Sequence, residues 1–172
     1  QATGTPVIIQ INHAGRSTSM EITGKKPVAP SRFREARKLR VKEIDALTEA
    51  FALAAERAMR AGFDGVEVHG AHGFLLNQFF SPLANRRLDK YGGSLENRMR
   101  FPLEVVERVK EKLGKRPLLY RLGSDDLNPA GTKIKDSKKF AMKLEEAGAD
   151  IIDVSGGLCG SRPERLQGKR GY

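Results

Sequence analysis

Four polar side chains of types that could do chemistry stand at or near the ends of short apolar runs. Gln10 lies within the run 7–11, His69 and His72 follow the run 65–68, and Arg121 lies within the run 118–122. Gln10 and Arg121 could also be ordinary buried polar residues, and the histidines could be loop residues or metal ligands. A metal is disfavoured because no third ligand stands at a recognisable spacing from the pair. Residue type by itself does not decide between a structural and a chemical role for these four side chains.

The elements that must position these side chains follow a regular alternation. Short apolar, β-branched runs predict buried strands, and apolar residues at helical spacing predict helices between them. The predicted strands are 7–11, 65–68, 118–122 and 151–154, and the predicted helices are 44–59, 101–113 and 136–147. The connections 13–31 and 69–93 are predicted to be irregular. Ser94 and Asp136 are expected to cap helices, and Pro102 predicts a kink or a late helix start.

Strands that alternate with helices imply parallel pairing with right-handed crossovers. An open doubly wound sheet and part of an eight-stranded barrel both satisfy this pattern. In either fold the active site gathers at the carboxyl ends of the strands. The polar residues at or just past those ends are Gln10, His69, His72, Arg121 and Ser155.

Composition bounds the class of protein. Hydrophobic residues make up 39% of the 172 residues and charged residues 30%, which is typical of a globular protein. No run of about 18 apolar residues is present, so we expect no membrane partner. A single cysteine, Cys159, allows no internal disulfide and favours a reducing compartment, the cytoplasm.

The chain is strongly basic, with 31 Lys and Arg against 21 Asp and Glu, a net charge of +10. Such a balance can indicate a nucleic-acid-binding domain. The basic residues are spread along the chain, however, and three tyrosines with no tryptophan offer little for base stacking. We therefore do not expect nucleic acid as a partner, and interpret the charge as a basic surface or one that meets an anionic ligand.

Several long motifs occur in a fixed order. They are IQINHAGR at 9–16, GFDGVEVHGAHGFLLNQF at 62–79, SP at 81–82, NRR at 85–87 and DKYGGSLENR at 89–98. Together they resemble the old yellow enzyme family of FMN-dependent NAD(P)H:flavin oxidoreductases, in its bacterial branch of ene-reductases and dienoyl-CoA-reductase-like proteins. The resemblance covers essentially the whole chain.

The resemblance implies a (β/α)₈ barrel with FMN at its C-terminal rim and NAD(P)H as the reductant. Gln10 matches the glutamine that hydrogen-bonds the pyrimidine side of the flavin, and Arg121 matches the arginine whose fixed charge suits reduced flavin. His69 and His72 match the pair that hydrogen-bonds the carbonyl oxygen of an activated alkene, the small-molecule substrate. The expected function is hydride transfer from NAD(P)H through flavin to such an acceptor.

Two features depart from the family pattern. Phe74 stands where the family usually has a proton-donating tyrosine, and phenylalanine cannot donate a proton. The chain, expected to be a single domain over 1–172, matches only strands three to six of the barrel, whereas a complete barrel needs about 250 residues. We therefore expect it to be part of a longer chain or to pair with another copy as a homo-oligomer. The alternative is a non-catalytic half-barrel that lacks the FMN phosphate site.

The remaining motif residues are expected to be architectural. His13 is expected to pack a loop, Arg98 to tie down the turn at 91–94, and Cys159 to lie in the loop after the last strand without activation.

Overall fold

A sheet of four parallel strands forms the centre of the computed structural model, which describes residues 4–160. The strands are β1 (Ile8–Ile11), β4 (Gly65–Gly70), β5 (Leu118–Gly123) and β6 (Ile151–Ser155), hydrogen-bonded in that order. Every pair is parallel. The order along the sheet equals the order along the chain, as in a barrel wall, and the strand predictions are confirmed to within two residues at each end.

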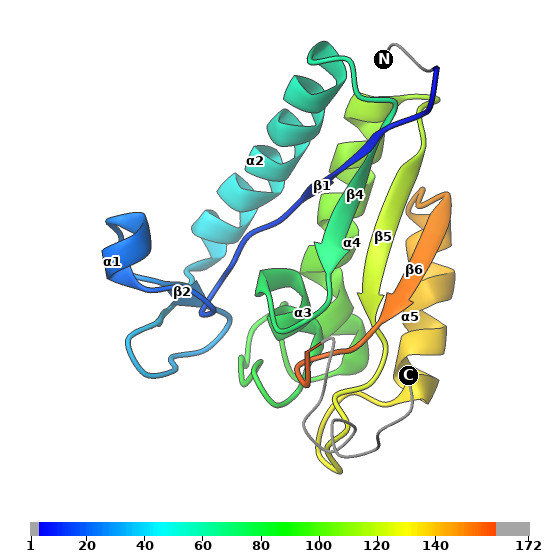
Figure 1. Cartoon of the computed structure of the whole chain (residues 1–172). Helices are drawn as coiled ribbons and strands as arrows, with labels where there is room; N and C mark the ends of the chain where they lie inside the picture. The colour runs from blue at the N-terminus through cyan, green and yellow to red at the C-terminus, as the bar shows by residue number, and fades with distance from the viewer. Residues whose placement is uncertain (1–3, 161–172) are drawn as a thin grey trace, which may run out of the picture.

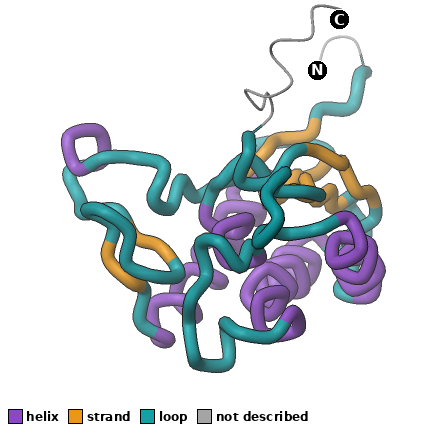
Figure 2. Tube along the Cα trace, turned by 90° about the horizontal axis from the view of Figure 1, so that it is seen from below, coloured by secondary structure: helices purple, strands orange, loops and turns teal. Residues whose placement is uncertain are grey.

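Three long helices cover one face of this sheet. They are α2 (Val41–Arg60), α4 (Leu95–Leu113) and α5 (Ile134–Glu146). Figure 1 shows them behind the strands, and Figure 2, along the sheet from below, shows them on one side only. The opposite face carries no helix among residues 4–160, so it corresponds to the concave interior of a barrel wall.

Side chains alternate between the two faces of each strand. In β4, Val66 and Val68 face the helices and are fully buried, whereas Glu67 and His69 face the concave side. In β5, Tyr120 faces the helices and packs on Phe140 of α5. A side chain at Gly70 would overlap the Tyr120 hydroxyl, which explains glycine at that position.

The helices are longer than predicted. Ser94 caps α4 by accepting from the Asn97 N–H at 3.2 Å, as expected. The prediction of a late start at Pro102 was wrong, since α4 begins at Leu95 and continues through the proline. Asp136 is not the N-cap of α5: Lys133 is, and the Asp136 carboxylate accepts from the Lys133 N–H at 3.4 Å.

The two segments predicted to be irregular contain short elements. The first holds α1 (Met20–Thr23) and β2 (Val28–Ala29), and β2 pairs with β3 (Arg37–Lys38). The second holds α3 (Leu75–Phe80), whose residues are all buried. Asn77 and Gln78 interrupt its apolar pattern, which is why hydrophobic periodicity did not reveal it.

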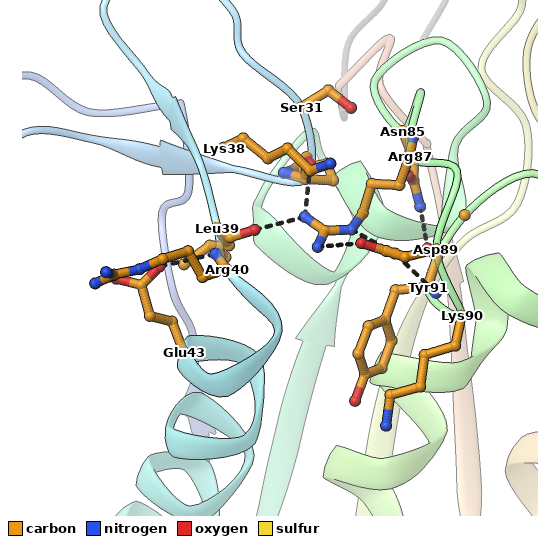
Figure 3. A network of polar contacts seen from close by, with 12 residues as sticks. Ser31, Lys38, Leu39, Arg40, Glu43, Asn85, Arg87, Asp89, Lys90 and Tyr91 are labelled. Atoms are coloured by element: carbon orange, nitrogen blue, oxygen red, sulfur yellow. Dashed lines mark hydrogen bonds and ion pairs between the residues drawn. The ribbon is translucent and has the colours of Figure 1, made fainter.

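A buried arginine joins these two segments. Arg87, 2% exposed, forms a two-pronged ion pair with Asp89, with Nε and Nη2 at 2.9 and 2.7 Å from the carboxylate oxygens. Its Nη1 donates to the carbonyl oxygens of Pro30 and Leu39 at 2.9 and 2.7 Å (Figure 3). This one side chain therefore fixes the loop after α3 against the strand pair β2–β3.

Replacing Arg87 with methionine is expected to destabilise the fold by about 3 kcal/mol, because two buried carbonyls and Asp89 lose their partner. Chemical denaturation of the full-length protein measures this change. The control is Arg86→Met, since the Arg86 side chain is exposed, and a change within about 0.5 kcal/mol is expected there. Equal losses in the two variants would contradict the role given to Arg87.

Candidate active site

The four candidate residues, here called the rim site (Gln10, His69, His72 and Arg121), lie on or beside the concave face toward the carboxyl ends of the strands. His69 of β4 stands beside Arg121 of β5, and Arg121 beside Asp153 of β6. Gln10 of β1 pairs with Glu67, two residues before His69 on the same face of β4. His72 lies in the loop that follows β4.

The two imidazole rings contact each other. Their centroids are 5.0 Å apart with the planes at 80°, and the Phe74 ring lies 5.0 Å from His69 on an edge-to-face contact. His69 is 4% exposed, and its Nδ1 has no hydrogen-bond partner among the described residues. A buried polar atom without a partner is costly in a finished core, so the orphaned Nδ1 indicates that a bound group completes this part of the site.

Burial and positive charge keep both imidazoles neutral. Burial, and then the neighbouring charges of His72 and Arg121, lower the pKa of His69 to about 4, against an opposing effect of Asp153. Burial and Arg121 also lower the pKa of His72. At neutral pH the pair therefore offers neutral N–H donors beside a fixed guanidinium charge.

These shifts predict how stability depends on pH. The pKa of His69 is lower in the folded protein than the usual 6.5, so the unfolded chain takes up the proton first. We expect the contribution of His69 to the free energy of unfolding to be constant above pH 6.5 and to fall as pH decreases toward 4. Denaturation at a series of pH values measures it, and His69→Asn should show a smaller decrease. An unchanged profile in that variant would contradict the shift assigned to His69.

The loop that carries His72 is held in a left-handed backbone conformation. His72 has φ 57°, and its N–H donates to the Gly156 carbonyl at 3.1 Å. The next residue, Gly73, donates to Asn77 Oδ1 at 2.9 Å and accepts from Gln78 Nε2 at 2.6 Å. The two buried amides of α3 thus position the histidine loop, a role that sequence reasoning missed although both residues lie in the motif.

A serine on the last strand fixes the second imidazole. His72 Nε2 lies 2.6 Å from Ser155 Oγ, a hydrogen bond in which either atom can donate depending on the tautomer. The sequence placed Ser155 at the strand end but gave no sign of this contact. Because Nε2 is engaged, the bond favours one orientation of the His72 ring and leaves Nδ1 as the ring nitrogen that can face a ligand.

We expect Ser155→Ala to raise the KM for a carbonyl acceptor about fivefold, the effect of losing one hydrogen bond of about 1 kcal/mol. Ser124→Ala is the matched control, since the Ser124 hydroxyl donates to the Ser155 backbone carbonyl at 2.9 Å rather than to a histidine. Steady-state kinetics of the full-length protein compares the two. A larger effect in the control would contradict this assignment.

Gln10 and Arg121 already have acidic partners on the concave face. Gln10 Nε2 donates to Glu67 Oε2, and Arg121 Nε forms an ion pair with Asp153 Oδ2 at 3.2 Å without the alignment of a hydrogen bond. The Asp153 side chain is 42% exposed, so Arg121 can turn to a ligand without leaving a buried charge behind. An adaptable amide and a guanidinium fit the edge of a flavin ring, and the unpartnered imidazole nitrogen beside them fits a carbonyl oxygen.

The other motif residues are structural, as expected. His13 Nδ1 accepts from the Gly15 N–H at 3.0 Å, within its own turn. Arg98 donates to the carbonyls of Phe80 and Gly93 at 2.9 and 2.6 Å, which ties down the turn at 91–94. Cys159 lies after β6, and burial raises the pKa of its thiol. Within residues 4–160, no three His, Cys, Asp or Glu side chains group as a metal site.

Comparison with known proteins decides the family. The sequence profile of the NADH:flavin oxidoreductase / NADH oxidase family matches residues 1–159. The chain belongs to this family. The family resemblance drawn from the motifs is confirmed.

Three related proteins show what share of a family member's length this chain covers. It is 45% identical to an NADH oxidase of Thermoanaerobacter brockii, over 97% of this chain and 27% of that protein. It is 42% identical to an NADPH dehydrogenase of a Geobacillus strain, over 98% of this chain and 50% of that protein. The solved structure of the old yellow enzyme homologue from Zymomonas mobilis matches with a TM-score of 0.82 at 30% identity, over 90% of this chain and 49% of that chain.

The chain therefore spans between about a quarter and a half of the length of these relatives. The predicted fold class, part of a (β/α)₈ barrel of the old yellow enzyme type, is confirmed. In the described part of the chain, no helix combines the length and the apolar character needed to cross a bilayer.

Proposed function

We propose that the full-length protein is an FMN-dependent oxidoreductase that passes hydride from NAD(P)H through flavin to an activated, enone-like alkene. The observation that carries this proposal is the neutral pair His69 and His72, in ring contact and beside the Arg121 guanidinium on the concave face. When bound, FMN supplies the hydride chemistry, which side chains cannot supply on their own.

The histidine pair acts as a hydrogen-bond donor to the acceptor. Two N–H groups aimed at one carbonyl oxygen polarise the conjugated double bond and stabilise the negative charge that develops on that oxygen. Neutral imidazoles suit this role, because a protonated imidazole at this position would be repelled by Arg121. The Nδ1 atom of His69, which has no partner among the described residues, is the ring nitrogen that we assign to the acceptor.

Gln10 and Arg121 are the residues that we assign to the cofactor. The amide donates and accepts at once, which matches a ring edge with alternating C=O and N–H groups. The guanidinium of Arg121 is positively charged, which favours the negatively charged reduced ring. To hold the ring, both residues would leave their present acidic partners, Glu67 and Asp153.

Phe74 cannot serve as the proton donor. Its ring packs against His69, at the position where the family usually has a tyrosine, and it has no proton to donate. The proton that the alkene carbon needs must therefore come from water or from another side chain. We propose that acceptor reduction is slow for substrates that depend on this proton.

The compartment and the assembly follow from the same reasoning. The single cysteine supports a reducing compartment, the cytoplasm. The uncovered concave face and the unpaired edges of β1 and β6 among the described strands support completion by the rest of a longer chain or by a second copy.

Absorbance of the purified full-length protein tests the proposal. A flavin band near 450 nm that NADPH bleaches without oxygen, and that an enone restores, is the expected result. A colourless protein that takes up no added FMN would contradict the proposal and favour the non-catalytic half-barrel. Nucleic acid that co-purifies and is lost at high salt would instead indicate a basic binding domain.

A further inference from the structure

Two arginines far apart in the sequence converge on one phenyl ring. The Cζ atom of Arg16 lies 4.1 Å from the centroid of the Phe33 ring, and that of Arg34 lies 5.4 Å from the same centroid. Each guanidinium is thus held by a cation–π contact. The arrangement places two positive charges on one small apolar support.

Within residues 4–160, neither arginine forms an ion pair with a carboxylate. Their neighbours in the same basic segment differ: Arg37 and Arg40 both pair with Glu43, at 2.8 and 3.2 Å. Burial, and then the charge of Arg34, lower the pKa of Arg16. The pair therefore carries positive charge that no acid of the described chain neutralises.

Hydrogen bonds hold the main chain at both arginines. Phe33 and Ala36 exchange two backbone hydrogen bonds, at 3.1 and 2.9 Å, around a tight turn in which Arg34 takes a left-handed φ of 50°. The Arg16 N–H donates to Gln78 Oε1 at 3.3 Å, so the amide that holds Gly73 also holds Arg16. The pair is therefore attached to the loop that carries His72, at the end of the sheet where β1 leads toward α1 and β2 (Figure 1).

We propose that Arg16 and Arg34 form a subsite for a phosphate group of a nucleotide-bearing ligand whose reactive end reaches the rim site. Guanidinium groups bind phosphate through paired N–H donors, and the two that share the Phe33 ring provide two such groups without a carboxylate partner. The phosphate belongs either to the coenzyme or to an acceptor esterified to coenzyme A. The ligand assignment rests on the proposed function, but the phosphate chemistry does not.

Isothermal titration of the full-length protein with two probes tests this subsite. Adenosine 2′,5′-bisphosphate carries the phosphate of NADPH, and adenosine 3′,5′-bisphosphate carries that of coenzyme A. We expect one of them to bind, more weakly as salt increases, and Arg34→Gln to weaken its binding about fivefold. The bound probe identifies the source of the phosphate.

Arg60→Gln is the matched control, because Arg60 is exposed and ends α2 at the opposite end of the sheet. It removes the same charge and is expected to leave probe binding unchanged. Equal weakening of probe binding in the two variants would show that only the overall charge matters, and would overturn the proposal. Failure of both probes to bind the wild type would also overturn it. Arg34-dependent binding in a preparation that takes up no FMN would support the subsite while contradicting the proposed function.

Discussion

Replacing His69 with leucine is expected to slow the reduction of a carbonyl-activated alkene by about 10²- to 10³-fold, the usual effect of removing one donor from an oxyanion site. The Nδ1 atom that the structure leaves without a partner is lost, and His72 alone cannot hold the carbonyl oxygen. Stopped-flow mixing of photochemically reduced enzyme with an enone measures this step alone. Reduction of the flavin by the coenzyme is thereby kept out of the measurement.

The control for this prediction is His13→Gln. His13 is partly buried, but its Nδ1 accepts from the Gly15 N–H within its own turn, so we expect less than about a threefold change in that variant. His69→Asn should recover part of the rate, because it restores a donor at nearly the same position. A His69→Leu enzyme that reduces the enone at the wild-type rate would contradict the donor role.

The second large effect is expected at Arg121. Arg121→Leu should raise the dissociation constant of FMN by about 10- to 100-fold, since a hydrogen bond to a charged group contributes about 1.5–3 kcal/mol. Flavin fluorescence during titration of the apoprotein measures the constant. The reduced flavin should be affected more than the oxidised form, so the reduction potential should also fall.

Asp153 provides the control that separates cofactor binding from fold. Arg121→Leu leaves the Asp153 carboxylate without its ion pair, so the double variant with Asp153→Asn removes that complication. Asp153→Asn alone frees Arg121 and is expected to bind FMN at least as tightly as the wild type. Weaker binding in Asp153→Asn than in Arg121→Leu would show that the pair serves the fold and not the cofactor.

The strands and the side of the sheet that carries the site could be predicted, because both depend on the pattern of apolar residues within a few positions of each other. Val66 and Tyr120 are fully buried on the helix side and Ile152 is partly buried there, and alternation then places His69 and Arg121 on the concave side. The parallel arrangement follows from the helices between the strands. The family motifs then supplied roles that residue type alone could not.

The contacts that hold the site could not be predicted, because they join residues distant in the sequence. The bond between His72 and Ser155 spans 83 residues, and the bond between Gln10 and Glu67 spans 57. Helix α3 was missed because Asn77 and Gln78 are buried polar residues that hold a loop. The role of Arg87 was also missed. Arg86 and Arg87 are adjacent and of the same type, and nothing in the sequence shows that Arg87 is buried while Arg86 is exposed.

A crystal structure of the full-length protein with FMN tests the central claim most directly. We expect the flavin ring at the carboxyl ends of β1, β4 and β5, with the Gln10 amide turned from Glu67 to the ring, Arg121 in contact with its pyrimidine side, and the histidine pair open toward its reactive face. A flavin bound elsewhere, with the Gln10–Glu67 and Arg121–Asp153 pairs intact, would contradict the account.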